Sequence, residues 1–172
     1  MQKIVLNACF GGYGWSNRAI VDYLKRKGIT NIRLARDAGL SDYVDIPESL
    51  FFDSTSTYSK TVLVKGRYLN LEYTKPDEWY PFYSGYIDRK DPIGIQLLEE
   101  KGSDYCSGKY AKLVIKEYDE ENWVACINEY DGSENLDLKP LVRKSKIRDC
   151  KSMEEVIEYL ETFDLFRYDK EE

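Results

Sequence analysis

The sequence predicts an α+β fold: a single domain over residues 1–172 with a mixed β-sheet, a strand–helix–strand start, a later antiparallel hairpin, and helices packed on the sheet. Short apolar runs of strand length occur together with segments whose apolar residues recur at three-four spacing. The chain has 42% hydrophobic and 14% aromatic residues, enough for 172 residues to bury a core. No linker or repeat divides it, so we expect one domain.

The first elements are a strand, a glycine turn and a helix. Residues 3–7 are predicted to form a short strand, since Ile4, Val5 and Leu6 make a continuous apolar run typical of a strand inside a sheet. Ser16 is a good N-cap for a helix with three-four apolar spacing, and Gly28 is placed to end it. A second strand over residues 31–35 would complete a strand–helix–strand unit, which favours a parallel pair with a right-handed crossover.

The middle of the chain predicts further strands followed by an aromatic loop. Residues 57–73 favour two strands joined near Gly66, or one strand with a bulge. Prolines and a glycine indicate a loop over residues 78–86. Its rings either cover the core or form a partner-binding patch. The residues proposed for that patch are Trp79, Tyr80, Phe82 and Tyr83.

A helix and a hairpin are predicted next. Asp91 followed by Pro92 is a helix start, and Gly102 is placed to end that helix. Two strand-like runs, residues 111–118 and 122–130, flank an acidic turn and therefore predict an antiparallel hairpin. The turn offers a second candidate surface for a partner, made of Asp119, Glu120 and Glu121.

The last part of the chain combines a basic stretch with an amphipathic helix. Residues 139–151 carry six positive side chains, so this stretch is either a solvated surface or a contact for nucleic acid or an acidic partner surface. Ser152 and Glu155 form a capping box that predicts a helix to about Phe163. We expect its buried face to consist of Met153, Val156, Ile157, Tyr159, Leu160 and Phe163.

Composition excludes several function classes. The chain has no histidine, so Ser-His and Cys-His catalysis are excluded, and we identify no catalytic residues. The four cysteines form no Cys-x-x-Cys pair, which predicts buried free thiols, no metal site and no cofactor. No apolar run is long enough to span a membrane, and no secretory signal is recognisable. A net charge of -6 disfavours direct binding of nucleic acid and suits a basic protein partner.

The glycine-rich segment over residues 7–16 is the most distinctive motif. Glycines between a strand and a helix can bring backbone amides close to an anion, which predicts a nucleotide or phosphate site. The segment lacks both the dinucleotide fingerprint and the P-loop lysine, so the alternative is a purely structural tight turn. A thiolate at Cys9 would lack a histidine base, so a small apolar group is expected there. The candidate ligand-binding residues are Asn7, Cys9, Gly11, Gly12, Gly14 and Ser16.

Two polar clusters, residues 88–91 and 129–134, could bring carboxylates together. Such carboxylates could bind magnesium or share acid-base work, but the spacing matches no recognised metal motif. We therefore expect Asp91 to cap a helix and Asp131-Gly132 to form the turn at the end of a hairpin.

Three stretches resemble one family of small phage and prophage proteins. The Asn-x-Cys-aromatic-Gly-Gly core of residues 7–12 is the most specific of them. The others are residues 88–92 with the following helix, and the hairpin that ends in residues 129–134. Members of this family often carry a His-Arg pair after the hairpin, where this chain has no histidine.

The resemblance implies a phage or mobile-element accessory protein in the cytoplasm of a bacterial host. Such proteins often bind and block host defence machinery, including CRISPR effector nucleases. We therefore expect a non-enzymatic, stoichiometric inhibitor of a host defence protein. The alternative is a small nucleotide-binding protein or enzyme that uses the glycine turn. The sequence leaves the oligomeric state open.

Overall fold

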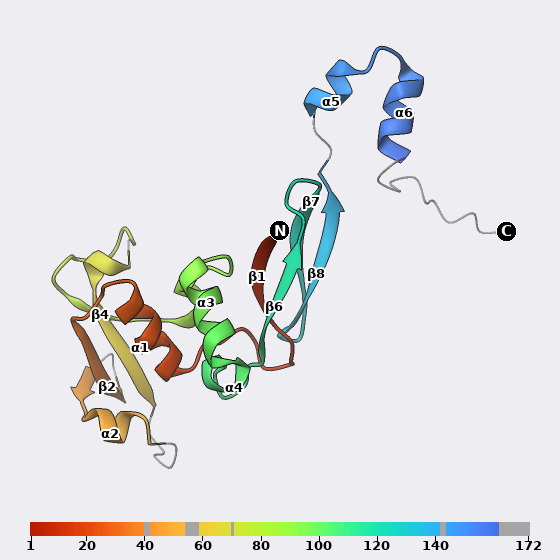
Figure 1. Ribbon diagram of the computed structural model, residues 1–172. Helices are drawn as coiled ribbons and strands as arrows, with labels where there is room; N and C mark the ends of the chain where they lie inside the picture. Colours follow the sequence, from red (N-terminus) through yellow and green to blue (C-terminus); the bar gives the residue numbers. More distant parts are fainter. Residues whose placement is uncertain (40–41, 54–58, 70, 142–143, 162–172) are drawn as a thin grey trace.

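The α+β class is confirmed by the computed structural model shown in Figure 1. It describes residues 1–39, 42–53, 59–69, 71–141 and 144–161. Within these residues every strand pair is antiparallel. The strands form a four-stranded sheet and two strand pairs, with α3 and α4 between the sheet and the pairs.

The four-stranded sheet has the order β3-β2-β4-β5. Helix α1, residues Asn17–Arg26, packs on β4 of this sheet, and the short helix α2 contacts β2. The remaining bounds here are β2 Ile32–Gly39, β3 Asp42–Asp45, α2 Glu48–Phe51, β4 Lys60–Lys65 and β5 Trp79–Pro81.

The two strand pairs lie on the other side of α3 (Figure 1). Strand β1 pairs with β6, and β7 forms a hairpin with β8 that also contacts β1. Helices α5 and α6 follow β8. The bounds are β1 Gln2–Asn7, α3 Pro92–Lys101, α4 Ser103–Cys106, β6 Leu113–Tyr118, β7 Trp123–Tyr130, β8 Ser133–Pro140, α5 Lys144–Asp149 and α6 Met153–Glu161.

The predicted parallel pair of the first two strands is wrong, and with it the mixed sheet. Strand β1 belongs to a different sheet from β2. Its apolar run is continuous because both of its faces are covered: Val5 joins the main core with α1 and α3, whereas Ile4 and Leu6 join a second cluster under the β7–β8 hairpin. A run buried on both faces is common in parallel sheets but does not require one.

The predicted hairpin of residues 111–118 with 122–130 is also wrong. Strand β6 pairs with β1, and β7 pairs instead with β8, which alternates polar and apolar residues without a strong strand signal. The turn at Asp131-Gly132 is confirmed. Both residues have positive φ, 48° and 81°, as a two-residue hairpin turn that matches strand twist requires.

The sequence patterns that mark helix starts predicted them correctly. Ser16 caps α1 by accepting a hydrogen bond from the Ala19 amide, and Asp91 caps α3 by accepting one from the Ile93 amide. Two assignments need correction. Residues Gly66–Tyr68 form a 3₁₀ turn, so that among the described residues of the 57–73 segment only β4 is a strand. Residues 79–81 of the predicted aromatic loop form the edge strand β5. A second 3₁₀ turn, Ser84–Tyr86, follows it.

Helix α6 forms as the capping box predicts, but its predicted buried face is wrong. No residue of α6 is buried, and the side chains of Met153 and Ile157 are 69% and 44% exposed. Phe163 lies outside the described residues, as does Arg143 of the basic stretch. The helix lies beyond the end of β8, away from the four-stranded sheet and from the two strand pairs (Figure 1).

Acid is expected to destabilise the fold partly through Asp91. Burial alone would raise its pKa, but hydrogen bonds from Lys27, the Ile93 amide and Tyr23 lower the pKa below its ordinary value. A folded-state pKa below the unfolded one adds stability at neutral pH, and this stability is lost as pH falls from about 4, the pKa of an unfolded aspartate, through the lower folded-state pKa. Urea unfolding at pH 7 and pH 3 should therefore show a smaller acid-induced loss for Asp91→Asn than for the wild type. Equal losses would contradict this role.

Candidate functional site

Three segments that are far apart in the sequence meet around Asn7 and Glu134. They are the glycine-rich segment after β1, the loop before α3, and the turn of the β7–β8 hairpin. Asn7 is fully buried, and its side-chain amide donates to the carbonyls of Cys9 and Gly132, both at 2.6 Å. Its side-chain oxygen accepts from the Lys112 amide at 2.7 Å. One asparagine thus holds three backbone segments together.

A buried ion pair joins the same segments. The two guanidinium nitrogens of Arg89 donate to the two carboxylate oxygens of Glu134 at 2.6 and 2.7 Å. The Glu134 side chain is only 2% exposed and also accepts from the Asn7 amide at 2.8 Å. A bidentate, hydrogen-bonded pair of this kind fixes geometry well. The polar clusters at 88–91 and 129–134 therefore do meet, but as an ion pair and not as a group of carboxylates.

Tyr13 completes this junction. Its ring lies under the Arg89 guanidinium, 3.8 Å from guanidinium carbon to ring centroid. Its hydroxyl accepts from the Trp15 indole at 2.7 Å and donates to the Ile87 carbonyl at 3.5 Å. Burial raises the pKa of Tyr13 above its ordinary value, although Trp15 and Arg89 act in the opposite sense. The hydroxyl is therefore neutral at physiological pH and serves as a hydrogen-bonding support.

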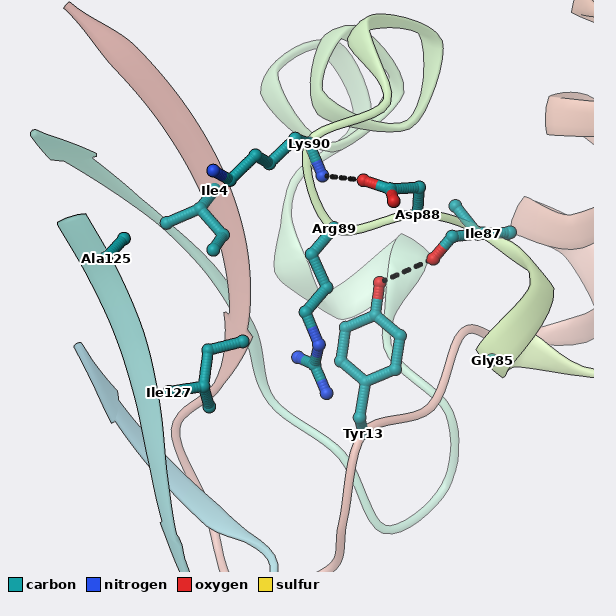
Figure 2. Close-up of a pocket in the computed structure, with 9 residues that line it drawn as sticks. All are labelled: Ile4, Tyr13, Gly85, Ile87, Asp88, Arg89, Lys90, Ala125 and Ile127. Atoms are coloured by element: carbon teal, nitrogen blue, oxygen red, sulfur yellow. Dashed lines mark hydrogen bonds between the residues drawn. The ribbon is translucent and has the colours of Figure 1, made fainter. Parts of the chain in front are cut away.

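A cleft of about 510 Å³ opens beside the junction (Figure 2). The Arg89 guanidinium lies between Tyr13 and Ile127 in this view. Lys90 is directed to β6, where its ammonium donates to the Tyr118 hydroxyl at 2.5 Å. With Arg89 held by Glu134, the lining suits an apolar side chain better than a reacting substrate. The residues that line the cleft are Ile4, Tyr13, Gly85, Ile87, Asp88, Arg89, Lys90, Ala125 and Ile127.

The glycine-rich segment makes close backbone contacts. A Cβ on Gly11 would overlap the Tyr110 carbonyl oxygen, and a Cβ on Gly132 would lie 2.5 Å from the Gly12 amide nitrogen. Gly12 itself has a φ of 82° but open space where a Cβ would be. Glycine at positions 11 and 132 is thus required by close approach and not only by turn conformation.

The other candidate ligand-binding residues make internal contacts too. The Cys9 thiol donates to the Asn7 side chain and the Tyr110 carbonyl at 3.4 and 3.3 Å. The Ser16 hydroxyl caps α1 and donates to the Tyr105 carbonyl at 2.7 Å. The Gly14 carbonyl accepts from the Gly108 amide. These contacts give the segment a structural role, and ligand binding by it stays a prediction.

Replacing Gly11 and Gly12 by alanine should distinguish the free-energy cost of a steric clash from the cost of a positive φ. We expect Gly11→Ala to destabilise the fold by on the order of 3 kcal/mol or more, because the Tyr110 backbone must move. Gly12→Ala should cost about 1–2 kcal/mol, because it adds only the strain of a positive φ. Urea denaturation of the two variants tests this order. A Gly12→Ala variant that is the less stable of the two would contradict the packing described here.

The same junction brings together the backbone segments that carry three exposed aromatic residues, Phe10, Tyr110 and Tyr130, which we call the aromatic surface. They are 70%, 67% and 77% exposed. Their backbones are neighbours because Gly11 packs on Tyr110, and the turn that follows Tyr130 packs on Gly12. The sequence pattern does not predict this surface, since only long-range contacts bring positions 10, 110 and 130 together. The one available signal was Phe10, an aromatic residue inside the glycine motif.

The predicted aromatic patch over residues 79–83 is largely engaged by the protein itself. Phe82 is buried in the core, and the Trp79 ring is covered by Lys65 and Arg33, 4.6 and 5.2 Å from its centroid. The Tyr80 hydroxyl donates to Glu78 at 3.0 Å. Only Tyr83, 59% exposed, is presented freely enough to anchor a partner.

The predicted acidic surface, Asp119 to Glu121, lies at the opposite end of β7 from the aromatic surface. Strand β7 has eight residues, which separates the two surfaces by about 24 Å. Hydrogen bonds from the Asn122 side chain and the Glu121 amide lower the pKa of Asp119 and fix the turn. Mutations on one surface can therefore distinguish binding through the aromatic surface from binding through the acidic one.

The burial of the four cysteines differs from the prediction. All four cysteines are free thiols, but only Cys106 is buried, where burial raises its pKa to about 11. The expectation that the other three are buried is wrong. No group of three or more cysteine or acidic side chains among the described residues could hold a metal. No described helix has the length and apolar character needed to cross a membrane.

Comparison with known proteins gives no relative: no family model, curated protein sequence or solved structure matches the chain.

Proposed function

We propose that this protein is a stoichiometric inhibitor of a bacterial defence protein and that it binds its target through the aromatic surface. The observation that carries this proposal is the presentation of Phe10, Tyr110 and Tyr130 on a junction held by Asn7 and by the Arg89–Glu134 pair. Large exposed rings on a rigid support lose little conformational entropy on binding, and aromatic residues dominate binding energy at interfaces.

The expected target is a nucleic-acid-processing effector, such as a CRISPR effector nuclease. This part of the proposal rests on the resemblance to phage accessory proteins and on the charge of the chain. Nucleases carry basic channels, and a chain of net charge -6 is attracted to them without binding nucleic acid itself. Charge would then assist the encounter, and the aromatic surface would supply most of the binding energy.

A titration against a purified CRISPR effector nuclease loaded with its guide RNA tests the proposal. An inhibitor of this kind abolishes cleavage near a fixed molar ratio, and the residual activity does not change with time. Loss of activity that progresses with time at trace amounts of the protein would show turnover and sink the proposal. A panel of effector types is needed, and absence of inhibition across the panel would also count against it.

A cavity of about 710 Å³ at the start of α1 supports a second candidate function, the binding of a nucleotide or another phosphorylated ligand. Ser16 and Asn17 of the helix start line it together with the positive side chains of Arg18, Lys60 and Lys109. Calorimetry against nucleoside triphosphates tests this candidate, with Arg18→Ala as the variant expected to weaken binding. No binding to the wild type at millimolar nucleotide would remove it.

A further inference from the structure

Helix α6 presents an apolar stripe in which no side chain is buried: Met153 and Ile157 are exposed, and Val156 and Leu160 are half-buried. Met153, Val156, Ile157 and Leu160 follow the spacing i, i+3, i+4, i+7 and so lie on one side of the helix. By contrast, α1, a helix of similar length, has five buried residues. Figure 1 shows α6 apart from the four-stranded sheet and from the two strand pairs.

Such a helix needs a packing partner to be stable. A helix of nine residues is marginal in water even with favourable sequence, and most helical stability in proteins comes from packing of the apolar side. The capping box at Ser152 stabilises only the first turn; there the Ser152 hydroxyl accepts from the Glu155 amide at 3.2 Å.

The charges around the stripe indicate what the partner is. The exposed positive side chains of Lys146, Arg148 and Lys151 precede the helix, and the helix itself carries four exposed glutamates. Within residues 144–161 no ion pair joins these positive side chains to the glutamates. A two-fold arrangement makes such a surface complementary to itself, because each basic segment then faces the acidic helix of the other copy. The glutamates are Glu154, Glu155, Glu158 and Glu161.

We propose that α5 and α6 form a homodimerisation element in which the apolar stripes of two copies pack together, flanked by basic-to-acidic contacts. This proposal does not depend on the inhibitory function. Two helices of nine residues bury less surface than a standard interface. The dimer is therefore expected to be reversible, with a dissociation constant on the order of 1–100 µM.

Sedimentation equilibrium of the full-length protein tests this directly. The wild type should change from monomer to dimer over that concentration range, and Ile157→Asp should stay monomeric throughout, because it places a charge in the apolar stripe. Leu50→Asp is the matched control: Leu50 lies on α2 and is 47% exposed, against 44% for Ile157. It should dimerise as the wild type does. A wild type that is monomeric throughout, or an equal effect of both substitutions, would overturn the proposal.

Charge reversal separates contacts between copies from contacts within one chain. One variant replaces Lys146, Arg148 and Lys151 by glutamate, and the other replaces Glu154, Glu155 and Glu158 by lysine. Each variant alone should be monomeric, because like charges then face each other across the interface. An equimolar mixture should restore a dimer, since each basic segment again meets an acidic one. A mixture that stays monomeric, with both variants folded by circular dichroism, would contradict the predicted contacts.

Discussion

Replacing Tyr130 by alanine is expected to weaken binding to the target about 30-fold while leaving the fold intact. Tyr130 is 77% exposed, so its ring contributes little to folding but offers the largest free contact area of the aromatic surface. Phe10→Ala should act in the same direction. Affinity measured by surface plasmon resonance against the inhibited nuclease gives the loss. Moderate salt should slow association, because charge assists the encounter, but it should change the dissociation rate little, because the contact is apolar.

Tyr83→Ala is the matched control for this prediction. It removes an exposed tyrosine that lies between β5 and the 3₁₀ turn Ser84–Tyr86, within the patch predicted from the sequence. We expect less than a threefold change in affinity for it. If Tyr83→Ala or Trp79→Ala costs more affinity than Tyr130→Ala, the binding surface lies at residues 79–83. If neutralising Asp119, Glu120 and Glu121 costs most and binding falls steeply with salt, the acidic turn is the binding surface.

Breaking the buried ion pair should have the largest effect on stability. Arg89→Met leaves the Glu134 carboxylate, 2% exposed, without its counter-charge. The loss of a single partner from such a pair costs on the order of 3–5 kcal/mol. Because the pair joins the loop before α3 to the β7–β8 hairpin, this variant should also loosen the aromatic surface. Urea denaturation measures the loss of unfolding free energy.

Two further variants control this measurement. Lys75→Met breaks the exposed pair of Lys75 with Glu78, which should cost about 1 kcal/mol or less. Adding Glu134→Gln to Arg89→Met should recover part of the lost stability, because a neutral amide needs no counter-charge and can still accept from the Asn7 amide. If Arg89→Met is no more destabilising than Lys75→Met, the ion pair does not hold the junction.

Short sequence patterns were enough to predict the helix caps, the helix ends and one turn. The caps at Ser16 and Asp91, the ends at Gly28 and Gly102, and the turn at Asp131 each depend on hydrogen bonds or backbone angles within a few residues. These features need no knowledge of the rest of the fold, so a sequence pattern is enough to find them.

Strand pairing could not be predicted in the same way. The run from Ile4 to Leu6 shows burial but not which elements bury it, and the antiparallel partner is β6, more than a hundred residues later. The same applies to the site. The motif of residues 7–16 was recognised as distinctive, but its function in joining Gly11 to Tyr110 and Asn7 to Gly132 depends on contacts that only the folded chain reveals.

Hydrogen–deuterium exchange of the complex with its target tests the central claim most directly. Binding through the aromatic surface predicts new protection at the three backbone segments that carry Phe10, Tyr110 and Tyr130, with little change at residues 79–83 and 119–121. Protection confined to either of those two segments, with residues 9–12, 108–111 and 129–132 exchanging as in the free protein, would contradict the account.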